Sequence, residues 1–269
     1  MDAPLAYPSA ALKVTSHAKR SEIDIPQYRR RAIFAIWAAA ALPMAALAWL
    51  VAPRLADHLS GPGHVPLSKA LIVTLTAGLI WQFLLVAILV RREQGTLRWS
   101  VTREALWLRS PRNPKNGRIG GRVWLVVIPL ALAFGAEDLL IPSLPHAVNR
   151  DLGAFLGTHN GQAFIHGAWG WYAILLLSFL FNTALGEELL FRGFLLPRMN
   201  AAFGRGDWLA NGLLFAAYHL HVPWVIPATL LDTFIIAYPT KRYRSAWIGI
   251  AIHSSQSIFF AIIGLSLVL

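Results

Sequence analysis

The sequence predicts an all-α protein that forms a polytopic transmembrane helical bundle of about seven spans, within a range of six to eight. Three observations predict this fold class: 56% of the 269 residues are hydrophobic, 14% are charged, and the mean hydropathy is +0.52. Soluble domains contain about 25% charged residues. The composition therefore indicates that a lipid bilayer solvates most of the chain.

Each expected span is an apolar run close to the roughly 20 residues that cross the hydrocarbon core of a membrane. The fifth and sixth runs are short and are separated only by a turn at Pro223. Residues 32–269 are expected to form one transmembrane domain behind a basic, disordered tail at 1–31. In chain order, the expected spans are 32–53, 68–90, 123–143, 169–196, 208–222, 223–240 and 245–268.

The net charge of +11 predicts the orientation of the bundle, because Lys and Arg accumulate in cytoplasmic loops. Twenty of the 24 Lys and Arg lie in 1–31, 91–122, 198–206 and 241–244, which share one side if the spans alternate. The N-terminus is therefore expected to be cytoplasmic and the C-terminus outside, in the inner membrane if the cell is bacterial. The bilayer is the expected partner of these charges, and no nucleic acid is expected.

The 91–122 loop interleaves Trp and Arg residues, a pattern typical of a segment at the lipid headgroups. The chain contains no cysteine, which excludes disulfides, a thiol nucleophile and cysteine-ligated metals. The first 31 residues contain no apolar core of signal-peptide length, so no cleaved secretory signal is expected.

Several polar residues lie within the expected spans, where a central charge costs roughly 2.5 to 3.5 kcal/mol if it faces lipid. They are therefore expected to face inward and to lie at a similar depth in the cytoplasmic half, in what we call the polar layer. These residues are Glu187, Glu188, Arg192, His219, Asp232, His253, Ser254, Ser255, Gln256 and Ser257.

Helical spacing sorts these residues into pairs. Glu188 and Arg192 are four residues apart and can form an ion pair, whereas Glu187 is turned by about 100°. His253 and Ser257 share a face in the same way. A carboxylate beside an imidazole can take a proton from water, and a second His with a neutral donor can stabilise an oxyanion. The pattern is typical of a peptidase without a covalent intermediate.

Three motifs in chain order resemble those of one family. The run 187–192 matches Glu-Glu-x-x-x-Arg, Phe215 and His219 match Phe-x-x-x-His, and His253 begins a His-x-x-x-Asn motif in which Ser257 stands in place of Asn. Over about 165–265 the chain thus resembles the CPBP family of CAAX-protease and bacteriocin-processing (Abi/Rce1-like) intramembrane glutamic endopeptidases.

The resemblance implies a role for each matching residue. Glu187 would be the general base, His219 would position the water, and His253 would lie in the oxyanion site. Glu188 and Arg192 would support them. The side chain of Ser257 is shorter than that of Asn. Either Gln256 or a bridging water is therefore expected to donate to the oxyanion, or the oxyanion is expected to be less well stabilised. The implied substrate is a membrane-associated or lipid-modified protein or peptide, the site is expected to open toward the cytoplasmic half, and no cofactor is expected.

Three other functions fit part of the pattern. A zinc peptidase would use Glu187, His219 and His253 as ligands, but the chain has no His-Glu-x-x-His motif. A non-catalytic scaffold, chaperone or immunity protein would account for Ser257. A proton-coupled transporter would account for buried carboxylates, but the sequence shows no inverted repeat.

Asp232 either joins the polar layer or pairs with Arg242 or Arg244, and His221 is expected to point away from His219.

Overall fold

The computed structural model describes residues 24–269, and helices are the regular elements of that range. Over the same residues no strand forms, and an isolated antiparallel bridge joins Arg112 to Ile119. The all-α prediction is confirmed. Of the tail predicted at 1–31, residues 1–23 lie outside the described range. Gln27 and Tyr28 hydrogen-bond to the carbonyls of Pro197 and Arg198 at 2.9 Å, so the end of this tail contacts the bundle.

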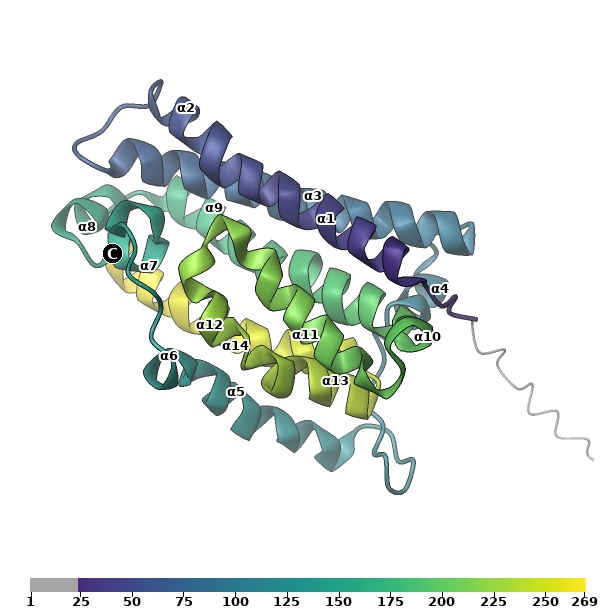
Figure 1. Ribbon diagram of the computed structural model, residues 1–269. Helices are drawn as coiled ribbons and strands as arrows, with labels where there is room; N and C mark the ends of the chain where they lie inside the picture. The colour runs from purple at the N-terminus through teal and green to yellow at the C-terminus, as the bar shows by residue number, and fades with distance from the viewer. Residues whose placement is uncertain (1–23) are drawn as a thin grey trace, which may run out of the picture.

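Four helices in residues 24–269 are long and apolar enough to cross a membrane, and Figure 1 shows them side by side. They correspond to the first, second, fourth and seventh predicted spans. Their segments are α1 (Arg30–Ala46), η1 (Leu47–Val51) and α2 (Ala52–Ala56); α3 (Val65–Gln94); α9 (Trp169–Leu180), η4 (Phe181–Gly186), η5 (Leu189–Leu195) and η6 (Leu196–Arg198); and α14 (Ala246–Val268).

The other three predicted spans are shorter or broken. The expected helix 123–143 is interrupted at Ala136, between α5 (Val127–Gly135) and α6 (Glu137–Leu140), and its last helical residue is Leu140. The number of spans stays a prediction. The third predicted span contains η2 (Gly121–Val126), α5 and α6. The fifth contains α11 (Asp207–Tyr218) and η8 (His219–His221), and the loop before it contains α10 (Asn200–Phe203) and η7 (Gly204–Gly206). The sixth contains η9 (Pro223–Val225), α12 (Ile226–Thr229), η10 (Thr233–Ala237) and α13 (Tyr238–Tyr243).

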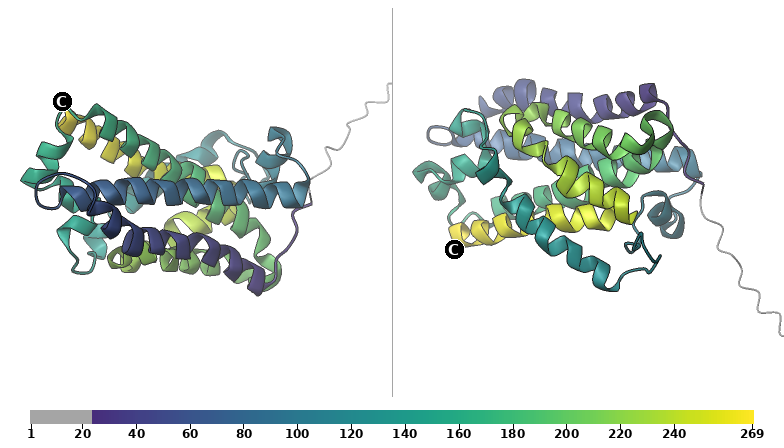
Figure 2. Two further views of the ribbon diagram at one scale, coloured as in Figure 1. Left: turned by 90° about the horizontal axis from the view of Figure 1, so that it is seen from above. Right: turned by 60° about the horizontal axis from the view of Figure 1, so that its bottom comes forward.

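The basic segments gather at one end of the bundle, here called the basic end. The backbone N–H of Arg112 donates to the carbonyl of Tyr243 at 3.0 Å, and that of Ala246 donates to Trp107 at 2.9 Å. These bonds join the 91–122 loop, which contains α4 (Trp99–Ala105), to the turn before α14. The N–H of Tyr28 donates to the carbonyl of Arg198 at 2.9 Å, and Nη1 of Arg198 donates to the carbonyl of Ala105 at 3.0 Å. The described part of the first basic segment, residues 24–31, therefore lies at the same end as the other three (Figure 2).

The opposite end is covered by residues 141–168 (Figure 1). The N–H of Gly167 donates to the carbonyl of Val268 at 2.9 Å, and the N–H of Leu144 donates to Trp224 at 3.0 Å. This cover contains η3 (Val148–Arg150), α7 (Leu152–Leu156) and α8 (His159–Ile165). The bundle therefore has a basic end and a capped end.

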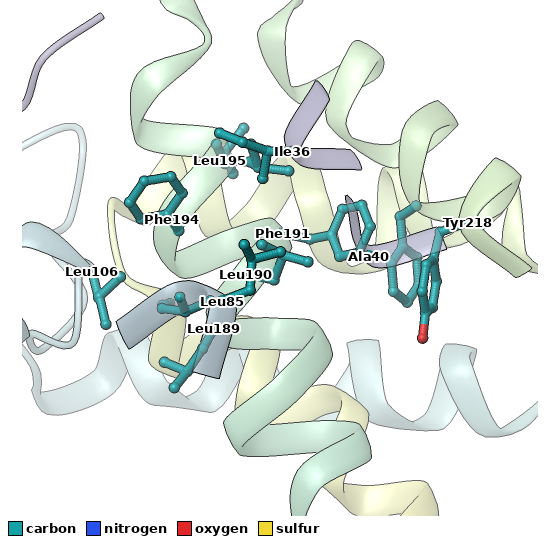
Figure 3. Packing of buried hydrophobic residues seen from close by; sticks show 14 of the residues in the cluster. Ile36, Ala40, Leu85, Leu106, Leu189, Leu190, Phe191, Phe194, Leu195 and Tyr218 are labelled. Carbon is teal, nitrogen blue, oxygen red and sulfur yellow. The ribbon is translucent and has the colours of Figure 1, made fainter. Parts of the chain in front are cut away.

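Segment η5 lies in the middle of the main hydrophobic core (Figure 3). Its side chains meet Ile36 and Ala40 of α1, Leu85 of α3 and Tyr218 of α11. Burial of apolar side chains contributes about 1.5–3 kcal/mol each in water, whereas in lipid the packing itself holds such helices together. This core fixes the backbone that follows Glu187 and Glu188.

Candidate active site

Glu187 and Glu188 lie between two π-helical stretches, η4 and η5. Both carboxylates are buried, with 1% and 0% of their surface exposed. A π-helical turn widens the helix and occurs often at functional sites. The two carboxylates are therefore held at the centre of the bundle by a helix that is not wound regularly.

One oxygen of Glu188 contacts two cationic or potentially cationic groups. Its Oε1 atom lies 3.0 Å from Nη1 of Arg192 and 3.1 Å from Nδ1 of His253. The ion pair expected from the four-residue spacing is confirmed. Gly249 permits this approach, because a Cβ atom there would lie 2.5 Å from Oε2 of Glu188 and 3.0 Å from Oγ1 of Thr240.

Arg192 is fully buried and lies on an aromatic ring. Its guanidinium carbon is 3.8 Å from the ring centroid of Phe215, a cation–π contact. The atoms Nε, Nη1 and Nη2 make no well-directed hydrogen bond, although Nη1 is in ionic contact with Glu188. Buried polar atoms without hydrogen bonds are rare in native proteins, and the charge of Arg192 is balanced by Glu188 and the ring of Phe215.

Phe215 also separates the two histidines of the layer. Its ring lies edge to face with His219, with centroids 4.9 Å apart, and with His253 at 6.1 Å. Phe134 of α5 contacts the other side of His253 at 5.4 Å. Segments η5 and η8 and helices α11 and α14 therefore bring Glu188, Arg192, His219 and His253 to one place.

The hydrogen bonds of His219 fix its tautomer. Nδ1 lies 3.0 Å from the carbonyl oxygen of Phe215, so Nδ1–H donates and Nε2 keeps a lone pair. Such an Nε2 atom can accept a proton or a hydrogen bond from water.

Glu187 interacts with a tyrosine that the sequence did not single out. The hydroxyl of Tyr218 bonds to Glu187 and accepts a hydrogen bond from Nε2 of Gln82 at 2.6 Å. Asp232 is also buried and interacts electrostatically with Glu187, while its pairing with Arg242 or Arg244 stays an untested alternative. Tyr218 and Gln82 carry no charge and match no motif, so only the structure identifies them.

Residues 168–259 match the family model described as type II CAAX prenyl endopeptidase Rce1-like. This stretch is an Rce1-like domain. At family level, this match supports a CAAX-type intramembrane protease, which is a hydrolase of peptide bonds. No curated protein and no solved structure matches the chain. The apolar helices and the family agree that the protein is an integral membrane protein.

His221 of the Rce1-like domain lies against His219 instead of pointing away from it. The rings of His219 and His221 are stacked, with centroids 5.6 Å apart and an angle of 23°, and His221 is 8% exposed. The expectation that His221 points away was wrong because α11 ends at Tyr218 and a 3₁₀ turn follows. His221 is therefore a neighbour of the candidate site.

Ser257 and Gln256 of the Rce1-like domain line a cavity of about 440 Å³ between α9 and α14. Asn182 of η4 lines the same cavity and provides an amide. An adjoining cavity of about 530 Å³ also contains Gln256 and extends to His146 and Asp151 under the cover of the capped end. Both cavities lie toward the capped end, and Glu187, His219 and His253 are not part of either lining.

Within residues 24–269, no three His, Asp or Glu side chains are arranged so that they could hold a metal ion. The three residues named for a zinc site each have other contacts: Glu187 with Tyr218, His219 with Phe215, and His253 with Glu188. A site that works without a cofactor stays a prediction.

Proposed function

We propose that the protein is an intramembrane glutamic endopeptidase that hydrolyses a peptide bond in a membrane-associated or lipid-modified protein. The observation that carries the proposal is the position of Tyr218: its hydroxyl bonds to the buried Glu187, and its ring centroid lies 5.2 Å from that of His219, whose Nε2 keeps a lone pair. Glu187 and this Nε2 atom accept hydrogen bonds from the same water, which becomes the nucleophile. The Rce1-like domain supports the reaction class.

In the proposed reaction, the water oxygen attacks the carbonyl carbon of the peptide bond as one water proton passes to Glu187. The C–N bond then breaks, and Glu187 gives this proton to the leaving amine. The products are a new carboxyl group and a new amine. Tyr218, which bonds to Glu187, holds the carboxylate in place between the two steps.

His253 supplies the oxyanion site in its doubly protonated form. A carboxylate only accepts, so the contact with Glu188 assigns the Nδ1 proton to His253. Nε2–H is then a donor only if the ring is an imidazolium, a charge that Glu188 stabilises. Glu188 is thus a positioning residue that sets both the direction and the charge of His253.

The substitution of Ser257 for the Asn of the family motif leaves the oxyanion site without an amide at that position. Gln256 is its neighbour, and Asn182 lines the same cavity as both. We assign the missing amide donor to Asn182 or Gln256. Replacement of each by Ala in turn should lower activity only for the residue that supplies the donor.

The proposed setting is a cellular membrane, the inner membrane if the cell is bacterial, with the basic end in the cytoplasm. The partners are the bilayer and a membrane-associated protein or peptide. The chain has no native cysteine, so single cysteines at the exposed Arg205 and His58 would label the two ends separately. An impermeant maleimide added to intact cells should label His58→Cys and not Arg205→Cys.

The decisive test compares the termini of membrane proteins, by mass spectrometry, between wild type and Glu187→Gln at equal expression. Glutamine preserves the shape and removes the base, so we expect a defined set of termini to fall by about 10²- to 10⁴-fold. Asp57→Asn makes the same change at an exposed site and should have no effect. If the termini persist in Glu187→Gln, the proposed function is wrong.

Ser257 favours one other function, a non-catalytic membrane scaffold or immunity protein of the same fold. In that case the double variant Glu187→Ala/His219→Ala would retain the full cellular function, whereas deletion of the gene would abolish it.

A further inference from the structure

A cavity of about 560 Å³ lies at the basic end, between α4, the 108–119 segment and the start of α14. Its wall contains four arginines and one carboxylate: Arg103, Arg109, Arg112, Arg244 and Glu104. We call this cavity the arginine pocket. It is separate from the polar layer, and neither the motifs nor the proposed reaction uses it.

The arginine pocket has an excess of positive charge. The carboxylate of Glu104 lies 3.5 Å from Nη2 of Arg103 and 3.8 Å from Nη1 of Arg109, so two guanidinium groups share it. Both distances exceed the roughly 2.7–2.9 Å of a charge-assisted hydrogen bond. Nε of Arg103 is buried and has no hydrogen-bond partner. Of the groups that line the pocket, four carry a positive charge and one a negative charge.

The backbone holds this charge cluster in place. Nε of Arg109 donates to the carbonyl of Arg244 at 3.1 Å, and the hydroxyl of Ser245 donates to the carbonyl of Arg109 at 2.5 Å. Trp107 and Arg244 have φ values of 51° and 50°, a left-handed conformation that is costly for residues with a side chain. The two strained residues flank the pocket, so its geometry is maintained at an energetic cost.

We propose that the arginine pocket binds the phosphate of an anionic phospholipid headgroup. Guanidinium groups bind phosphate through paired hydrogen bonds, and pockets of this kind on the cytoplasmic side of membrane proteins take lipid headgroups. Apolar surface adjoins the arginines, since Trp247 and Ile119 line the pocket and are 37% and 63% exposed. Exposed Leu125 and Ile128 continue this surface along η2 and α5.

The position of the pocket selects a lipid over a soluble phosphate. Trp247 is the second residue of the membrane-spanning helix α14, so the pocket lies where that helix enters the bilayer. A headgroup bound there would place its acyl chains along the apolar surface of η2 and α5. A free phosphate would gain nothing from that surface.

The test uses the full chain in nanodiscs of phosphatidylcholine that contain a minor share of phosphatidylglycerol, with retained lipid counted by native mass spectrometry. Arg103→Gln/Arg244→Gln should retain about tenfold less phosphatidylglycerol than wild type. The control Arg91→Gln/Arg92→Gln removes two exposed charges from the same end and should retain the wild-type amount. Equal loss in both double variants, or loss in neither, would overturn the proposal.

A second variant tests the pocket without the removal of an arginine. Glu104→Gln releases Arg103 and Arg109 from their shared carboxylate and should increase the retention of phosphatidylglycerol. This outcome does not depend on whether the arginine variants fold. Inorganic phosphate at millimolar concentration should leave the bound lipid in place. If phosphate displaces it and binds equally well in detergent, the occupant is a soluble anion and the lipid proposal is wrong.

Discussion

Two buried ion pairs in this protein have the same chemistry and different surroundings. Arg198 and Arg192 are each 0% exposed, and each contacts a glutamate and the ring of a phenylalanine within 4 Å. The Glu93–Arg198 pair lies at the basic end, where α3 and η6 finish. The Glu188–Arg192 pair lies in the polar layer.

The difference between the pairs is in their hydrogen bonds. Arg198 donates from Nε to both oxygens of Glu93 at 2.9 and 3.0 Å, from Nη2 to Oε2 at 2.6 Å, and from Nη1 to the carbonyls of Ala105 and Phe194. Arg192 has one ionic contact, and none of its nitrogens makes a well-directed hydrogen bond. The Glu93–Arg198 pair fastens helices together through five hydrogen bonds, whereas Arg192 is held by one ionic contact and by the ring of Phe215.

The first way to test this contrast is Arg198→Met, which should have the largest effect on stability. The change leaves Glu93 nearly buried beside Tyr28 without a cation, and loss of one partner of a buried pair costs about 3–5 kcal/mol. Denaturant unfolding in detergent micelles measures the loss. A cost near zero would show that the Glu93–Arg198 pair does not fasten the helices.

The second test, Gly249→Ala, acts mainly on the polar-layer pair, because Glu188 is the nearest neighbour of the added methyl group. The new methyl group would meet Oε2 of Glu188 at 2.5 Å, and an overpacked core loses about 1–3 kcal/mol. Displacement of Glu188 from His253 should also lower the rate of cleavage. Gly170→Ala on α9 is the matched control, since no atom lies within 4 Å of its added Cβ, and it should be neutral. Equal effects of the two changes would argue against close packing at Gly249.

The third test, Arg192→Met, should cost about 1 kcal/mol, less than the same change at Arg198, because Glu188 keeps its contact with His253. The rate of cleavage should nevertheless fall. Unfolding and cleavage of the two methionine variants are measured side by side. If Arg192→Met proves as destabilising as Arg198→Met, the two pairs have the same structural role.

The smallest effect is expected from Tyr28→Phe, at about 0.5–1.5 kcal/mol. Burial and the bond to Glu93 raise the pKa of Tyr28 above its ordinary value of 10.0. The folded state therefore favours the neutral phenol, and this contribution is present below pH 10 and lost as the pH rises above it. The stability difference between wild type and Tyr28→Phe should be constant from pH 7 to 9 and decline beyond pH 10. A difference that grows above pH 10 would contradict this.

The sequence was sufficient for the fold class and for the long helices, because apolar runs of bilayer length have few alternatives. It also placed Glu188, Arg192 and His253 together, since charges in such helices must find partners. The roles of Glu187, His219 and His253 remain predictions that only activity can test.

What the sequence did not predict depends on helix geometry. A regular helix through residue 222 would turn His221 away from His219, but α11 ends at Tyr218 and the rings stack. The π-helical turns around Glu187 leave no signature in the residue types. Tyr218 and Gln82 escaped notice because neutral polar residues in an apolar helix are common. These failures concern local helix geometry and the choice of site residues, and none concerns the identity of a long helix.

The contact of a single oxygen, Oε1 of Glu188, with both Arg192 and His253 makes these two residues competitors for one acceptor. Each gains when the other's bond weakens, so their contributions cannot be additive. In the proposed reaction, a substrate that draws His253 toward its own oxygen would leave Oε1 of Glu188 to Arg192 alone. Binding at the proposed oxyanion site would thereby be felt by the helix that carries Glu187, the proposed general base.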